Sequence, residues 1–182
     1  MKLCLTLFSR VGILLLLCLL VAVTAACGDR GKASSSASEK AIVIDASKPA
    51  DVSPILVTDF DLEDVLTSGL PVILNFGSDD AGSADTLAAL AILHRDIGHL
   101  VLIRSVDLAA KPEAREGYPV QVIPTQFFFS ADGAPIPLNL EISVLMSGLY
   151  LSDTGEPVFT IHEGPLSLTE FAEVLTHMGV VK

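Results

Sequence analysis

The chain has 182 residues, enough for one domain of ordinary size plus additional segments, and a formal net charge of −11. It contains no cluster of Lys and Arg, so nucleic-acid binding is not expected, because contacts to phosphates need basic residues. The three cysteines, Cys4, Cys18 and Cys27, all lie within the first 27 residues. Intrachain disulfides, zinc held by cysteine and cysteine nucleophiles are therefore excluded for the folded domain.

Residues 1–26 have the pattern of a targeting segment, with Lys2 and Arg10 ahead of an apolar run from Val11 to Val23. The residues around Cys27 resemble a bacterial lipoprotein processing site, which implies a signal peptide over residues 1–26 and lipid on Cys27. Two alternatives remain open: an uncleaved N-terminal anchor, and a soluble secreted protein that is cut nearby. Without residues 1–26 the formal charge becomes −13, from 9 basic and 22 acidic residues.

Residues 27–40 are rich in Ser, Ala and Gly, and this composition predicts a flexible tether. We therefore expect a domain over residues 41–182, anchored by lipid to the cell membrane on its extracytoplasmic side. At the start of this domain, Ala41–Asp45 and Ile55–Val57 are apolar pieces, and we expect one or both to form edge strands. Asp61–Ser68 is predicted to be a helix, with Asp59 or Asp61 as its N-cap.

The stretch from Val72 to Ile97 is predicted to form a buried strand, a tight turn and a helix. Val72–Phe76 is a short apolar run that suits a strand covered on both faces, and the helix is expected over Asp85–Ile97. Asp79 and Asp80 precede this helix, where carboxylates either cap free backbone N–H groups or act as a general acid and base. Capping needs no further assumption, so we interpret them as helix caps.

The second half of the chain carries further strand and helix patterns. Ser167–Met178 is predicted to be an amphipathic helix that starts with a capping box of Ser167 and Glu170. The other predicted elements are a strand over Leu100–Val106, a short helix over Lys111–Glu116, a strand over Gln126–Phe129 and a strand over Val158–Ile161.

The strand, turn and helix around residue 80 resemble the active-site region of the thioredoxin family. In the register of that family, Ala81-Gly82-Ser83-Ala84 stands where the Cys-Gly-Pro-Cys motif is found, Asp80 replaces a tryptophan, and Asn75 replaces a buried aspartate. Ala89 stands where the family has a proline that kinks the helix, so we expect a straighter helix. The resemblance thus implies a degenerate site, without redox sulfur at Ala81 and Ala84 and without the former proton acceptor at Asn75.

Ile123-Pro124-Thr125 is the second point of resemblance, because a similar triplet with a cis proline precedes the fourth strand in thioredoxin-like proteins. The resemblance implies a cis Ile123–Pro124 bond that faces Ala81, and it makes Ile123, Pro124 and Thr125 the substrate-facing residues. The alternative is an ordinary trans proline that breaks a loop before a strand. The fold class that follows is α/β, a thioredoxin-like fold with a central mixed sheet flanked by helices.

Residues 134–157 depart from a minimal thioredoxin, in which a tight hairpin joins the last two strands. This insert is either a lip that contacts a partner or an extra strand or helix that covers the core, and we favour the second interpretation.

Other chemistry has little support in the sequence. The four histidines, His94, His99, His162 and His177, show no pair at metal-ligand spacing, so we expect no metal and no other cofactor. His162 and Glu163 are adjacent, but no nucleophile lies near them in the sequence. No phosphate-binding glycine loop and no nucleophile elbow are present.

The absence of cysteine at positions 81 and 84 bears on whether the domain is an oxidoreductase or a binding module. Disulfide exchange needs an attacking thiolate and a resolving thiol, and the domain has neither. We therefore expect a binding module of the cell envelope for an extracytoplasmic protein or peptide, with the balance against an enzyme. Two alternatives remain: a thiol–disulfide oxidoreductase that takes its sulfur from another protein, and a structural subunit that uses the fold for assembly.

Overall fold

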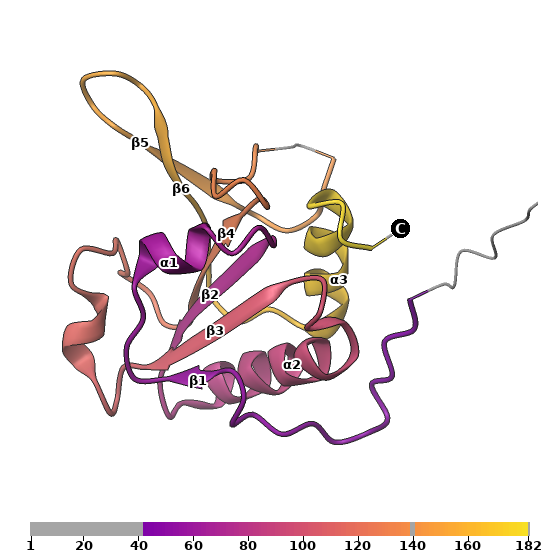
Figure 1. Cartoon of the computed structure of the whole chain (residues 1–182). Coiled ribbons are helices and arrows are strands. Elements are labelled where there is room, and N and C mark those ends of the chain that lie inside the picture. The colour runs from indigo at the N-terminus through magenta and orange to yellow at the C-terminus, as the bar shows by residue number, and fades with distance from the viewer. Residues whose placement is uncertain (1–41, 139–140, 182) are drawn as a thin grey trace, which may run out of the picture. The chain divides into compact units, whose positions relative to one another are not determined.

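The computed structural model describes residues 42–138 and 141–181 (Figure 1). The predicted signal peptide, tether and Cys27 lie outside the described residues. In chain order the elements are β1 (Leu56–Val57), α1 (Leu62–Leu66), β2 (Val72–Gly77), α2 (Ala81–Ile97), β3 (Leu102–Asp107), the 3-10 helix η1 (Pro112–Arg115), β4 (Thr125–Phe129), β5 (Ser147–Tyr150), β6 (Pro157–Glu163) and α3 (Leu168–His177).

The six strands of the described chain form one mixed sheet in the order β1-β3-β2-β4-β6-β5. β1, β3 and β2 are parallel to one another, whereas β4, β6 and β5 run antiparallel to their neighbours. Every residue of β2 is buried, as predicted for a strand covered on both faces. The predicted α/β architecture is confirmed: a central mixed sheet is flanked by helices.

Two apolar cores cover the two faces of the sheet, because successive residues of β2 point to opposite sides. Ile73 packs in one core with Leu90 of α2 and Phe171 of α3. Phe76 lies in the other core with Val65 of α1. The helices are therefore divided between the faces, with α2 and α3 on one side and α1 on the other (Figure 1).

α2 is a 17-residue helix that continues without interruption through the buried Ala89. It begins at Ala81, four residues earlier than the predicted start at Asp85, because Asp80 is its N-cap. The start of α2 thus includes the whole Ala81–Ala84 turn. Within the described part of the chain, no helix combines the length and the apolar character needed to cross a bilayer.

The two predicted edge strands at the start of the domain have different outcomes. Ile55–Val57 is confirmed in part as β1, which pairs with β3. Residues 42–45 form no strand. The physical reason is that the backbone of Asp45 bonds to side chains of α2 instead of a neighbouring strand: its N–H donates to Asp96 and its carbonyl accepts from Arg95.

The capped helices agree with their sequence signals. Asp61, not Asp59, caps α1 by accepting from the backbone N–H groups of Glu63 and Asp64. The capping box of Ser167 and Glu170 is present at the start of α3. The short helix predicted after Lys111 is η1, with its proline in the first turn.

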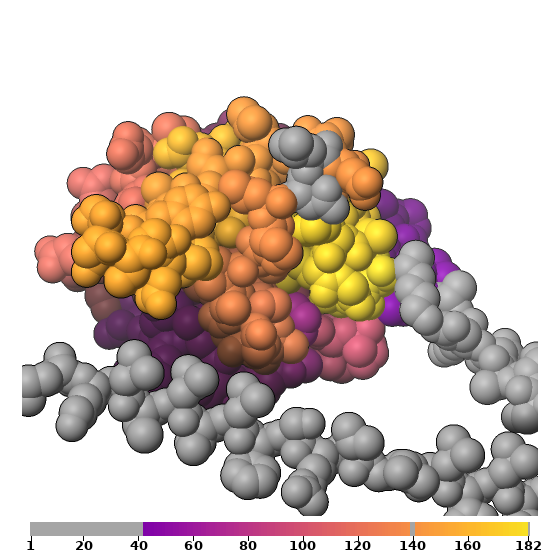
Figure 2. Space-filling view, turned by 90° about the horizontal axis from the view of Figure 1, so that it is seen from above, coloured from indigo at the N-terminus to yellow at the C-terminus, as the bar shows by residue number. Residues whose placement is uncertain are grey.

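The insert over residues 134–157 adds β5, an edge strand that pairs with β6, as the favoured interpretation predicted. Its earlier part lies against α3, where the N–H and hydroxyl groups of Ser143 donate to the carboxylate of Glu173 and the ring of His177 donates to the carbonyl of Pro137. Figure 2 shows the orange insert beside the yellow surface of α3. The insert therefore extends the sheet and also covers one end of the core.

Candidate functional site

The candidate site lies at one end of the sheet, where three strands and the start of α2 meet. The register pairs Phe76 of β2 with Thr125 of β4, and Thr125 with Glu163 of β6. On the other side of β2, Gly77 pairs with Asp107 of β3. This geometry brings the Ala81–Ala84 turn and the triplet at Pro124 to the same end of the sheet.

The side chain of Asp80 organises the turn between β2 and α2. One carboxylate oxygen accepts the backbone N–H of Ser83 at 2.9 Å, and the other accepts the Ser83 hydroxyl at 2.7 Å and the hydroxyl of Ser78. The hydroxyls of Ser78 and Ser83 lower the pKa of Asp80 to about 2. The capping prediction is thus confirmed for Asp80, whose charge also complements the positive end of the helix dipole.

The turn presents methyl groups where a redox pair would need sulfur. Ala81 and Ala84 are exposed, and Ser83 between them is buried and bonded to the cap. An alanine methyl has no lone pair with which to attack a disulfide and no proton to transfer. The turn is therefore accessible from solvent and chemically inert toward disulfides.

Asn75 lies below the turn in a buried polar network that the sequence analysis did not find. The Asn75 Nδ2 donates to the Ser105 Oγ at 2.8 Å, and the Gln126 Nε2 donates to the Asn75 Oδ1 at 3.1 Å. All three residues are at most 3% exposed, and the Gln126 Oε1 has no partner among the described residues. The network contains only neutral groups, so it offers no carboxylate to accept a proton.

Gly77 lies between this network and the turn. A Cβ on Gly77 would be 3.3 Å from the Asn75 Nδ2 and 3.5 Å from the Ser83 Oγ. The close approach shows that the buried amide of Asn75 sits directly beneath the start of α2.

The Ile123–Pro124 peptide bond is cis, as the resemblance implied. The carbonyl of Pro124 accepts the N–H of Gly164 at 2.8 Å, and the buried hydroxyl of Thr125 donates to the Val122 carbonyl at 2.5 Å. Pro124 is itself buried, Ile123 is half-buried, and Val122 is 46% exposed. The accessible part of this loop is therefore Val122 and Ile123; sequence reasoning had missed Val122.

The segment that follows β6 links the two halves of the site. Gly164 bonds to Pro124, and the next residue, Pro165, lies against the turn, because a Cβ on Gly82 would be 3.7 Å from the Pro165 Cβ. Pro165 also lines a cavity of about 480 Å³ between α2 and α3, together with Asp85 and Ile92. Sequence reasoning did not identify Pro165, which only the tertiary structure brings to the site.

The histidines lie at separate places in the described chain, and none joins the site as a metal ligand. His162 donates from Nδ1 to the carbonyl of Leu145 at 2.8 Å, which ties β6 to the insert. In the described ranges, no group of three or more His, Cys, Asp and Glu side chains is placed to hold a metal ion.

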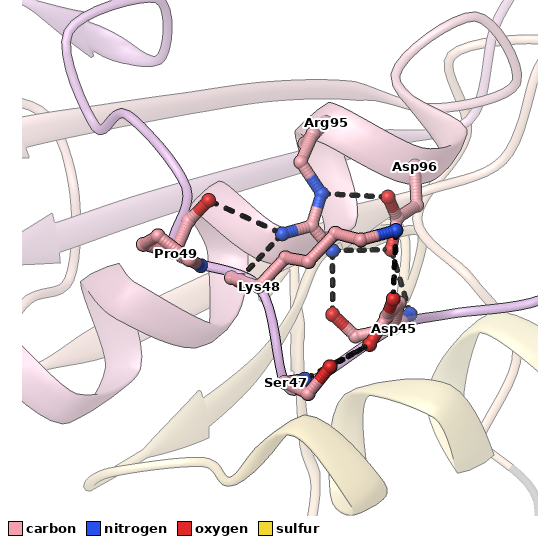
Figure 3. A network of polar contacts seen from close by, with 6 residues as sticks. All are labelled: Asp45, Ser47, Lys48, Pro49, Arg95 and Asp96. Atoms are coloured by element: carbon pink, nitrogen blue, oxygen red, sulfur yellow. Dashed lines mark hydrogen bonds and ion pairs between the residues drawn. The ribbon is translucent and has the colours of Figure 1, made fainter.

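The other end of α2 holds the first part of the domain. Arg95 donates from Nη1 to the Lys48 carbonyl and from Nη2 to the Asp45 carbonyl, both at 2.6 Å, and Asp96 accepts the N–H of Asp45 at 2.9 Å (Figure 3). Arg95 also forms two bonds of 2.7 Å to Asp96, which orient both side chains. This clamp fixes residues 45–49 at the end of α2 opposite the candidate site.

Comparisons with known proteins add little to this geometry. No protein-family model matches the chain, and no curated protein sequence matches it. Among solved structures, a chloroplastic thioredoxin z is similar with 13% identity and a TM-score of 0.47, over 68% of this chain and 92% of that one. The thioredoxin Mala s 13 of Malassezia sympodialis is similar with 14% identity and a TM-score of 0.44, over 68% and 89% of the two chains.

Proposed function

We propose that this protein is a membrane-tethered, redox-inactive thioredoxin-like domain that binds an extended segment of another protein outside the cytoplasm. The observation that carries the proposal is the contrast within the site. The cis Ile123–Pro124 bond and the capped start of α2 are present, whereas Ala81 and Ala84 bear methyl groups and Asn75 is a neutral amide. A scaffold kept without its redox groups favours binding over electron transfer.

The binding surface in this proposal is the loop before β4. Exposed Val122 and half-buried Ile123 offer apolar contact, and an extended peptide would add main-chain hydrogen bonds. Ala81 and Ala84, at the same end of the sheet, are exposed and have side chains that end at Cβ. Pro124 and Thr125 are buried, so in this proposal they hold the loop in place and do not contact the peptide themselves.

The tether in this proposal is residues 27–40, with lipid on Cys27. Within the described domain, the clamp at Arg95 holds Asp45 at the far end of α2 from the site. A helix of 17 residues spans about 25 Å, at roughly 1.5 Å per residue.

An insulin-reduction assay with dithiothreitol tests the redox part of the proposal. The protein is expected to give the same rate as a control without protein. Turnover above that control would contradict the proposal and favour an oxidoreductase that recruits an external thiol.

A trapping experiment tests the binding part. The Ala81→Cys variant has an attacking thiol without a resolving one, so a mixed disulfide with a partner that carries a disulfide should persist. The Ala88→Cys variant, exposed two turns further along α2, is the matched control. We expect trapping from native membranes by Ala81→Cys alone, reduced when Val122→Asp is added. Equal trapping by both cysteine variants would remove the support for a groove beside Pro124.

A further inference from the structure

A second cavity, of about 300 Å³, lies between the residues that precede α1 and the helix η1. The rings of Phe60 and Tyr118 form part of its wall, and the carboxylates of Asp59, Glu113 and Glu116 belong to its lining. None of these residues belongs to the candidate site described above. Aromatic rings and carboxylates in one cavity are the groups that attract organic cations.

The aromatic wall is fixed by the core behind it. The centroids of Phe60 and Tyr118 are 5.9 Å apart, and both rings contact Phe76, at 6.3 Å and 4.9 Å. Tyr118 also contacts Phe127 at 5.6 Å. Rings held in this way keep their orientation, so a cation placed against them need not order them first.

The charge around the cavity is strongly negative. Residues 42–181 contain five Lys and Arg against twenty Asp and Glu. Asp59, Glu113 and Glu116 line the cavity and are exposed to solvent. Burial, and after it the nearby negative charge of Asp61, raises the pKa of the Tyr118 hydroxyl.

The lining of the cavity includes one ammonium group of the chain itself. Lys111 lines it and places its Nζ 3.3 Å from the Asp59 Oδ2, with the Lys111 side chain 29% exposed and that of Asp59 84% exposed. An alkylammonium group of the chain is therefore paired with one carboxylate of the cavity rim. The Lys111 ammonium pairs with the rim carboxylate of Asp59, whose side chain is mostly exposed, so the ion pair is weak.

We infer that the Phe60–Tyr118 cavity binds an alkylammonium group from outside the chain, with Lys111 as an internal competitor. The ring faces supply cation–π attraction, and the rim carboxylates supply the charge. The same chemistry belongs to a lysine side chain of a polypeptide and to a free quaternary amine. The inference is independent of the proposed function, because it uses neither the α2 turn nor the Pro124 loop.

Titrations of the full-length protein test this inference, with the amide signals of Ala114, Glu116 and Tyr118 as the NMR readout. The probes are tetramethylammonium and Nα-acetyl-lysine amide at constant ionic strength, and tert-butanol is the neutral control. We expect saturable shifts with at least one cation and none with tert-butanol. Saturation by tetramethylammonium alone would assign a free quaternary amine, and saturation by the lysine amide would assign a polypeptide side chain. Equal shifts with tert-butanol, or no saturation with either cation, would overturn the inference.

Three variants distinguish binding in the cavity from a general effect of the protein's charge. Phe60→Leu should weaken binding by about 2- to 5-fold, and thermal unfolding shows whether the variant is folded. Lys111→Met should strengthen binding, because the competitor is gone. Arg115→Met removes the same charge from η1 at a residue that does not line the cavity, so it is the matched control. Equal effects of Lys111→Met and Arg115→Met would contradict the role of Lys111.

Discussion

The Arg95 guanidinium donates to the carbonyl of Asp45 at 2.6 Å, across 50 positions of sequence. The same guanidinium reaches the Lys48 carbonyl and is oriented by the Asp96 carboxylate (Figure 3). Because these bonds satisfy backbone groups that lack a strand partner, they take the place of the predicted edge pairing. These bonds therefore fix the position of residues 45–48 against α2.

Substitution of Arg95 by Met should release residues 45–49 from α2. We expect faster amide hydrogen exchange at Asp45 and earlier proteolytic cleavage before β1, because the Asp45 carbonyl and the Lys48 carbonyl lose their donor. Hydrogen–deuterium exchange with mass spectrometry measures this effect. Lys48→Met is the control, since it removes only an ion pair whose Lys side chain is 72% exposed. Equal exchange in the two variants would show that the clamp does not hold the segment.

Asp80 should make stability depend on pH through its helix cap. Its pKa is lowered from 3.8 to about 2 by hydrogen bonds to Ser78 and Ser83. The ionised carboxylate therefore stabilises the fold above pH 3.8, and this contribution is lost as the pH falls toward 2. Urea unfolding of wild type and Asp80→Asn from pH 2 to pH 7 should show a stability difference that closes at the acid end. A difference that stays constant with pH would contradict the cap.

The Asn75→Asp variant should be less stable at pH 8 than at pH 5. A carboxyl group at this position, which is 1% exposed, would have its pKa raised by burial, so its protonated form favours folding and the benefit is lost as the pH rises. We expect a loss of about 1–3 kcal/mol at pH 8. Denaturant unfolding at both pH values measures it. Asn75→Leu removes the same amide without adding a charge, and its cost should not change with pH.

Ser167→Ala should destabilise the protein by about 1 kcal/mol through loss of the capping box at α3. The Ser167 hydroxyl accepts from the backbone N–H of Glu170, while the Glu170 carboxylate accepts from the backbone and hydroxyl of Ser167. Thermal unfolding gives the change. Thr169→Ala, at an exposed position of the same turn, serves as the comparison. If the two substitutions cost the same, the box does not contribute.

Local signals in the sequence were sufficient for the elements whose stability depends on neighbouring residues. Asp61, Asp80 and Ser167 each cap a helix through bonds to residues two or three positions away. Such bonds form within one turn, so a short stretch of sequence contains both partners. The buried strand at Val72 was predicted for a similar reason, because a run of apolar residues between turn formers has few other uses.

The absence of any thiol after Cys27 was also determined by the sequence alone. Only the tertiary structure decided which side chains meet across long stretches of sequence. Asn75 meets Ser105 and Gln126 across 30 and 51 positions, Pro165 reaches the turn at Gly82, and Arg95 captures Asp45. These contacts join segments that are distant in the sequence. Their side chains could contact many other groups equally well, so the packing of the sheet and helices determines which pairs form.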